Sequence, residues 1–160
     1  DDNLYHFDHI QFEANQNDAV GAFSEYAWRI RIGGFLNNDK LPFQDFIHFN
    51  TQSLPFLIRN HQDVFMLPDY YSLATPEYYL EGHFRYTTPY LLIKLLPFLS
   101  NSLMRENISL AYLYSPHTNH YYELGYSLSE IFLIGKIGVF VGFEDLAYKA
   151  TGLRFTFIFN

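Results

Sequence analysis

The fold of this protein is indicated most clearly by one alternating stretch, Tyr122-Glu123-Leu124-Gly125-Tyr126-Ser127-Leu128-Ser129. Every second side chain in it is aromatic or aliphatic, and the residues between them are small or polar. Successive side chains of a β-strand point to opposite faces of the sheet. This period of two therefore predicts a strand with one apolar face and one polar face.

The same alternation recurs along the chain and predicts an all-β fold of seven strands. Further strands are expected at residues 25–35, 77–88, 107–114, 137–143 and 153–159. An N-terminal strand is expected at 4–14, where the apolar phase switches near Asp8 and suggests a bulge. A long irregular segment, residues 36–76, follows the second strand, and a loop of that size inside a compact domain is usually functional or evidence that the strands are miscounted. Residues 89–103 read as a short apolar turn or helix that is broken at Pro97.

Composition limits the classes of protein to which the chain can belong. The 160 residues are expected to form one domain; 20% of them are aromatic, 17% are charged, and the net charge is -7. Lysine and arginine are scattered, which argues against a nucleic-acid-binding surface. Because the sequence has no cysteine, disulfides, thiolate zinc sites and cysteine nucleophiles are excluded. The longest apolar runs are too interrupted for a membrane-spanning helix, which needs about 20 apolar residues.

Two antiparallel architectures share this alternation: a soluble sandwich, and a membrane barrel whose apolar face meets lipid while its lumen is polar. Tyrosine and phenylalanine flank the apolar faces at the strand ends, as in the aromatic girdles of outer-membrane barrels. The opposite faces carry charged residues, among them Glu81, His83, Arg85 and Glu123. The pattern favours an antiparallel transmembrane β-barrel, and a soluble β-sandwich binding module is the alternative.

The C-terminus is a second indication of a barrel. Residues 151–159 read as a polar residue, Gly152, two further residues, and then Phe155, Phe157 and Phe159 at every second position. This form resembles the signal by which bacterial outer-membrane barrels are recognised for insertion. A free strand edge so rich in phenylalanine would be an aggregation hazard in water unless it closed a barrel or found a partner. We therefore expect this strand at a barrel seam, paired with a first strand from outside this sequence.

Three segments resemble a known family: Tyr79-Leu80-Glu81-Gly82-His83-Phe84, Leu95-Leu96-Pro97-Phe98-Leu99 and Leu103-Met104-Arg105-Glu106. They look like the final part of Bacteroidota outer-membrane proteins in which a carboxypeptidase-regulatory-like domain precedes a barrel similar to the BamA/TamA assembly factors. The resemblance implies a barrel of about sixteen strands, of which residues 1–160 would be the C-terminal portion. It also implies a place in the bacterial outer membrane and a role in inserting or translocating proteins through a lateral seam. The partners it implies are outer-membrane lipids, nascent or translocating proteins and other subunits of an outer-membrane complex.

The resemblance also gives the long segment 36–76 an orientation. If the last strand ends in the periplasm, this segment is extracellular and corresponds to the loop that folds back into the lumen in that family. That loop carries an arginine in a Val-Arg-Gly-aromatic sequence, and the similar stretch here is Leu57-Ile58-Arg59-Asn60-His61. We expect Arg59 inside the lumen with Glu81 or Glu123 as its partner, in an ion-pair network that also includes His83 and Arg85.

No pattern in the sequence favours catalysis, a cofactor or a bound metal. The seven histidines include pairs three residues apart, whose side chains would point to opposite faces of a strand. Glu81 and Glu123 are expected to pair with arginines instead of working as an acid/base pair. Those arginines are Arg29, Arg31, Arg85 and Arg59. A transport or receptor barrel is the first alternative to an assembly factor, and the soluble module is the second.

Overall fold

The computed structural model describes residues 7–37, 41–58, 63–69, 71–97, 99 and 102–157. The strands are β1 (Asp8–Val20), β2 (Ser24–Asn37), β3 (Phe56–Leu57), β4 (Tyr79–Thr88), β5 (Arg105–Ser115), β6 (Asn119–Ile131), β7 (Gly135–Glu144) and β8 (Ala147–Phe157). Two short 3-10 helices, η1 (Phe43–Asp45) and η2 (Ile93–Leu95), lie in the described connections. None of the helices in this part of the chain is long and apolar enough to cross a membrane.

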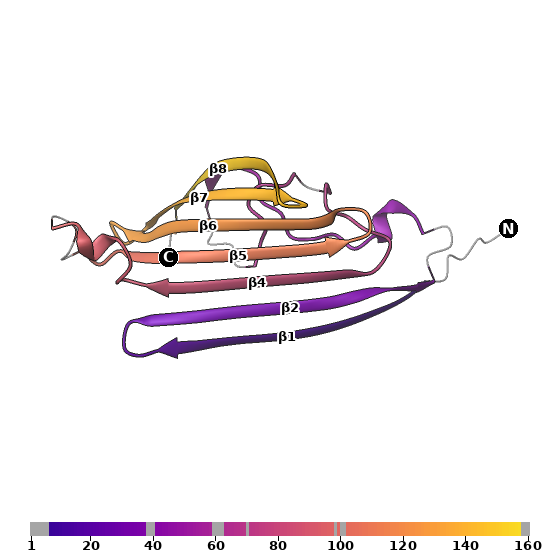
Figure 1. Cartoon of the computed structure of the whole chain (residues 1–160), viewed down its shortest axis with the longest axis horizontal. Helices are drawn as coiled ribbons and strands as arrows, with labels where there is room; N and C mark the ends of the chain where they lie inside the picture. Colours follow the sequence, from indigo (N-terminus) through magenta and orange to yellow (C-terminus); the bar gives the residue numbers. More distant parts are fainter. Residues whose placement is uncertain are drawn as a thin grey trace.

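All of these strands belong to one sheet in the order β1-β2-β4-β5-β6-β7-β8-β3, which curves as a single layer in Figure 1. Each long strand pairs antiparallel with the next long strand along the chain, whereas β3 pairs parallel with β8. The described sheet has two free margins and is not closed into a ring. The prediction of an all-β fold with seven long antiparallel strands is confirmed.

The first strand differs from its predicted bounds. The sequence predicts it at residues 4–14, whereas β1 continues to Val20. Its second half is mostly polar and lacks the alternation, but it stays paired with residues 24–29 of β2, for example Gln16 with Trp28. The hairpin turn then follows at Gly21, whose φ of 69° suits a residue without a side chain. The register shifts between Asp8 and His9, which confirms the irregularity predicted near Asp8.

Because neighbouring long strands are antiparallel, their connections gather alternately at the two ends of the sheet. One end carries the long connection from β2 to β4 and the turns at 116–118 and 145–146. The other end carries the turns at 21–23 and 132–134 and the connection at 89–104, which contains η2. Asp145 and Leu146 have φ values of 48° and 67°. This backbone matches the twist of the flanking strands in a two-residue hairpin.

The connection from β2 to β4 is predicted as an irregular loop, but it forms a folded layer. We call its described residues, 41–58, 63–69 and 71–78, the cover segment. Within it Ile47 bridges Thr75 and Thr51 bridges Phe65, so the chain doubles back on itself. The cover segment passes behind the sheet in Figure 1. Its buried side chains meet those of the sheet in two clusters, Phe49, Phe65, Leu73, Tyr79, Leu113 and Tyr121, and Leu57, Met66 and Phe140.

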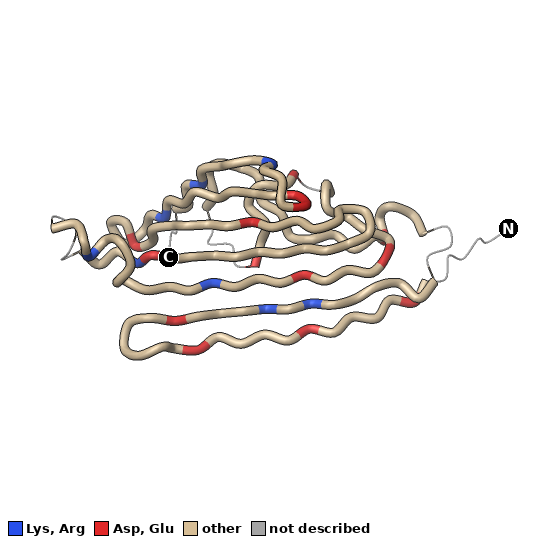
Figure 2. Tube along the Cα trace, in the orientation of Figure 1, with Lys and Arg blue, Asp and Glu red and all other residues tan. Residues whose placement is uncertain are grey.

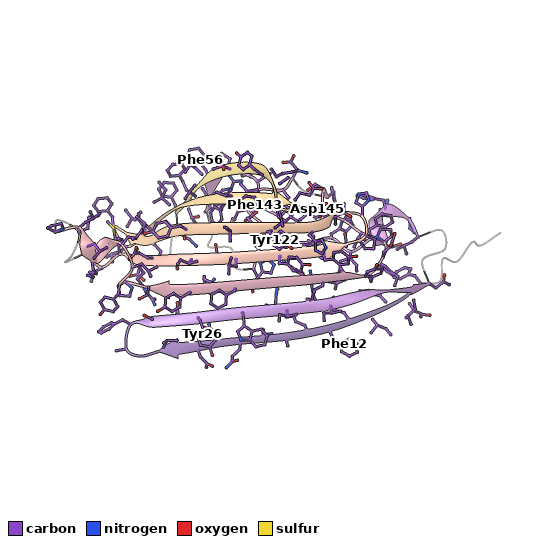
Figure 3. All side chains as sticks on the ribbon, in the orientation of Figure 1. Phe12, Tyr26, Phe56, Tyr122, Phe143 and Asp145 are labelled. Atoms are coloured by element: carbon purple, nitrogen blue, oxygen red, sulfur yellow. The ribbon has the colours of Figure 1, made fainter. Side chains whose placement is uncertain are left out.

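The two faces of the sheet differ in chemistry. The face under the cover segment, here the covered face, carries buried polar side chains: Glu81, His83, Thr87, Asn107, Glu123, Ser127, Arg154 and Thr156. The opposite face, the open face, carries exposed apolar side chains: Phe12, Ile30, Ile32, Phe84, Ile108, Leu110, Leu124, Val139, Leu153 and Phe157. Figure 3 labels Phe12 and three half-buried aromatic residues of the same face, Tyr26, Tyr122 and Phe143, and the four lie on different strands. The apolar side of each strand therefore faces away from the protein's own core.

Candidate functional site

The covered face holds a carboxylate, Glu81, that is contacted by two arginines of the neighbouring strand β2 and by a histidine of its own strand β4. Arg31 lies directly opposite Glu81 in the register of β2 and β4, and Figure 2 shows the basic and acidic positions facing each other. Arg31 Nε donates to Glu81 Oε2 at 2.7 Å, and Arg29 Nη2 lies 3.4 Å from Oε1. His83 Nε2 is hydrogen-bonded to the same Oε1 at 2.8 Å. Since Glu81 is only 1% exposed, these partners replace its lost hydration.

This Glu81 cluster also contacts the cover segment. Arg29 Nη2 donates to the backbone oxygen of Asp63 at 3.2 Å, and the Asp63 carboxylate lies 3.9 Å from Arg29 Nε. The ring of Phe65 lies 4.9 Å from that of His83. The Arg31 guanidinium lies over the ring of Phe49, 5.7 Å from its centroid, within the range of a cation–π contact. The cluster therefore anchors the cover segment to β2 and β4.

A second anchor grips the backbone of the cover segment at Met66 and Leu67. Glu123 Oε1 accepts from the Met66 amide at 2.8 Å, and Oε2 accepts from the Leu67 amide at 3.0 Å. Arg154 Nε donates to the Met66 carbonyl at 2.9 Å, and its Nη2 donates to the same oxygen. Tyr121 completes the group, because its hydroxyl donates to Glu123 Oε2 at 3.0 Å. The backbone N–H of Met66 is thus bonded to a side chain of β6, and its C=O is bonded to a side chain of β8.

Two glycines leave room for the cover segment at this anchor. A Cβ at Gly142 would lie 3.0 Å from Leu67 Cδ1, and one at Gly152 would lie 2.7 Å from Leu67 Cδ2. Real Cβ atoms do not approach other atoms as closely as the second distance, so a side chain at Gly152 would force Leu67 to move. Gly152 was predicted from the sequence as part of an insertion signal. In the structure Gly152 lies against the side chain of Leu67.

The predicted ion-pair network is partly brought together. Glu81 and His83 lie in one cluster, with Arg29 and Arg31 as the cations, which confirms these two of the expected arginine partners. Glu123 belongs to the other anchor, where its partners are backbone amides and a tyrosine and not an arginine of the expected set. Arg85 makes no hydrogen bond or ion pair with any described residue, and it lines a small cavity on the same face. Arg59 lies outside the described residues, so its predicted place in the lumen stays a prediction.

The predicted seam strand is β8, the last of the long strands. Gly152, Phe155 and Phe157 lie on it, and Phe159 lies outside the described residues. We expected β8 to pair at its outer edge with a strand from outside this sequence. In the structure that edge carries β3, a strand of the cover segment. The sequence does not predict this pairing, because residues 54–58 lie inside the stretch that reads as an irregular loop.

The two carboxylates have little freedom for chemistry. Each oxygen of Glu81 and of Glu123 already accepts a hydrogen bond or ion pair from a fixed partner. In the part of the chain that the structure describes, no three His, Cys, Asp or Glu side chains gather where they could hold a metal ion. The arrangement is suited to retaining a polypeptide segment against a polar wall.

The fold and these anchors define a class: an all-β domain whose open antiparallel sheet retains a folded chain segment on a buried polar face. The chain belongs to a family of unknown function (DUF5686), whose C-terminal domain matches residues 1–128. The matched part extends to β6 and contains the cover segment, Glu81 and Glu123, whereas Arg154 lies beyond it. No curated protein and no solved structure matches the chain.

Proposed function

We propose that this chain is the C-terminal part of an outer-membrane β-barrel of the assembly-factor type, which helps to insert or translocate proteins at the bacterial outer membrane. The observation that carries the proposal is the inversion of the sheet, with polar side chains buried and apolar side chains exposed. Soluble monomers rarely expose contiguous apolar patches larger than about 300–600 Å². In a membrane barrel this arrangement is expected, because lipid covers the apolar face and the lumen is polar.

Strand length and connectivity support a membrane barrel as well. The seven long strands have 10 to 14 residues. A tilted transmembrane strand needs about 9–11 residues. The strands follow one another as a meander, which is the topology of outer-membrane barrels. In this proposal the missing strands of the barrel would join the two margins of the sheet.

The cover segment is the reason to prefer an assembly factor to a transporter or receptor. It is the longest connection, it folds back onto the polar face, and two buried anchors hold it there. In the BamA/TamA-like barrels that the sequence resembles, a long loop likewise folds back into the lumen. A transport or receptor barrel, the first alternative, is favoured instead if the cover segment moves to admit a solute. A soluble sandwich, the second alternative, needs a second sheet on an apolar core, and the described residues form one sheet.

A pair of spin labels tests the membrane part of the proposal. Because the sequence has no cysteine, Leu124→Cys and Ser127→Cys introduce single labelling sites on opposite faces of β6. In the whole protein reconstituted in lipid bilayers, the label at 124 should be accessible to oxygen, which dissolves in lipid, and protected from a water-soluble nickel complex. The label at 127 is the matched control and should be protected from both. A label at 124 that the nickel complex reaches freely would contradict a lipid-facing open face.

The assembly part needs a separate experiment. Vesicles containing the whole protein should speed the folding of an unfolded outer-membrane barrel protein, compared with vesicles of the same lipid without it. If folding is unchanged while a small solute crosses the vesicle membrane, the transport alternative is correct.

A further inference from the structure

The outer edge of β8, the strand predicted at the seam, is occupied by a piece of the cover segment. Phe56 and Leu57 of β3 are in parallel register with Phe155 and Thr156 of β8. The Phe155 amide donates to the Pro55 carbonyl at 2.8 Å. Residues 56–57 of the cover segment therefore leave the layer under the sheet and form a short strand at the margin of the sheet.

The side chains of β3 continue both faces of the sheet. Phe56 is 65% exposed, and its ring stacks on that of Phe155, with the centroids 5.5 Å apart. Figure 3 shows Phe56 beside β8. Leu57 points the other way, is 3% exposed, and packs with Met66 and Phe140 under the sheet. The edge thus receives an extended segment with a large apolar residue outside and an aliphatic residue inside.

The ladder between β3 and this edge of β8 is short. It has two residues in register with β8, whereas β7 has ten on the other side of the same strand. Pro55 has no N–H to donate, which prevents β3 from lengthening its ladder in that direction. Among the described residues, no other strand pairs with this edge of β8. Most of the backbone groups along this edge therefore have no strand partner among the residues that the structure describes, and a longer strand could pair with them.

We propose that residues 55–57 are a built-in occupant of the β8 edge, and that their release is the step that lets an extended strand of another polypeptide add there. The partner is identified by its chemistry: a β-strand with apolar residues at every second position, of the kind that outer-membrane proteins carry. Strand addition uses main-chain hydrogen bonds for affinity and alternate side chains for specificity. This inference rests on the proposed function, since it names the edge and the internal competitor of the seam.

The occupant is linked to the anchors of the covered face. Leu57 packs against Met66, whose peptide Glu123 and Arg154 hold from both sides. Loosening that anchor therefore withdraws the support on which Leu57 rests. Release of the cover segment and opening of the β8 edge are expected to occur together.

The first experiment asks whether the edge is occupied in the whole protein. With the double substitution Phe56→Cys and Phe155→Cys, oxidation should produce an intramolecular disulfide in membranes, because the two residues are direct register partners. The control pair, Phe56→Cys with Val139→Cys, joins β3 to a β7 residue that is not its partner and should stay reduced. A second register pair, Leu57→Cys with Thr156→Cys, guards against a folding defect of the first. If neither register pair cross-links in folded protein, the edge is not occupied and the inference is wrong.

The second experiment measures competition with a labelled synthetic peptide that copies residues 53–58. Phe56→Ser with Leu57→Ser should weaken the internal strand, so the peptide should bind this variant at least about tenfold more tightly than the parent. That factor corresponds to an edge that is free in about one parent molecule in ten. The disulfide-locked protein should not bind it. A peptide with Phe and Leu exchanged is the control, since it presents each side chain to the wrong face. Equal binding by all three proteins would overturn the inference.

These results can be separated from the fate of the proposed function. The cross-link and the peptide measurements report on the β8 edge alone, whereas the label at Leu124 reports on lipid. If the cross-link forms and the label meets water, the barrel proposal fails and a strand-binding edge remains. If the label meets lipid and no register pair cross-links, the barrel stands and the built-in occupant does not.

Discussion

β1 and β6 each have 13 residues, but their burial is opposite. Every residue of β1 is exposed on both faces, whereas buried residues recur at every second position of β6 from Tyr121 to Ser127. In the described sheet β1 is a margin strand that pairs with β2 alone, whereas β6 pairs with both β5 and β7. The cover segment adds to the difference, because Arg29, Glu123 and Arg154 hold it against the covered face. The polar face is thus buried only where a second layer is held against it.

This comparison makes the anchors testable. If they hold the cover segment in place, their removal should make the covered face of β6 behave like β1, while β1 itself changes little. The following substitutions weaken the anchors by decreasing amounts.

The largest effect is expected from Glu81→Ala. The substitution leaves Arg29, Arg31 and His83 without their shared acceptor in a largely buried site. Removing one member of a buried charge cluster destabilises a protein by about 3–5 kcal/mol. Unfolding in urea, followed in the same lipid or detergent for both proteins, measures the loss. Glu13→Ala on exposed β1 is the control and should change the free energy of unfolding by less than about 0.5 kcal/mol. Equal losses from both substitutions would mean that burial does not distinguish β4 from β1.

The second substitution, Glu123→Gln, acts on the backbone anchor. The carboxylate accepts from the amides of Met66 and Leu67 through separate oxygens, and a glutamine offers one oxygen. A buried amide left without its acceptor costs about 1–3 kcal/mol. Hydrogen exchange at residues 66 and 67 should therefore accelerate about 5- to 150-fold, while exchange in β1 is unchanged. Glu130→Gln, on an exposed residue of β6, is the matched control. Unchanged protection at 66 and 67 would show that Glu123 does not hold the segment.

The third substitution, Gly152→Ala, tests the close packing of Leu67 against Gly152. The new Cβ would lie 2.7 Å from Leu67 Cδ2, and overpacking of this kind costs about 1–3 kcal/mol. Gly82→Ala is the control, because a Cβ there meets no atom within 4 Å. When Leu67→Ala is added to the Gly152→Ala protein, it should restore much of the lost free energy of unfolding. Without that rescue, the strain lies elsewhere on β8.

The strands could be predicted because the alternation that identifies each strand lies within consecutive residues. In β6, Tyr122, Leu124 and Tyr126 show which side is apolar without knowledge of any partner. The pairing of Glu81 with Arg29 and Arg31 could also be anticipated, because residues of one face on neighbouring strands meet across the register. The C-terminal bound of β1 could not be predicted, because its polar second half has no alternation and is a strand through its pairing with β2.

The cover segment could not be predicted in detail, because its anchors join groups that leave no local pattern. Glu123 binds the backbone amides of Met66 and Leu67, and every residue except proline has such an amide. Arg154 was visible as the polar residue between Leu153 and Phe155, but its acceptor is a carbonyl 88 residues away. Two residues of β3 are also too few for an alternation to be recognised.

The smallest effect is expected from Tyr121→Phe, and it compares the two faces of the sheet directly. On the covered face the Tyr121 hydroxyl donates to Glu123 Oε2 at 3.0 Å, and the phenylalanine removes this bond while keeping the ring. The expected loss is about 0.5–1.5 kcal/mol, because Glu123 keeps both backbone amides. Tyr112→Phe removes a bond of similar length on the open face, where the hydroxyl is 2.9 Å from His120 Nδ1. That bond is exposed, so its removal should change stability by less than about 0.5 kcal/mol. Urea unfolding of the two variants measures this difference, and a loss at Tyr112 as large as that at Tyr121 would contradict the distinction between a buried and an exposed face.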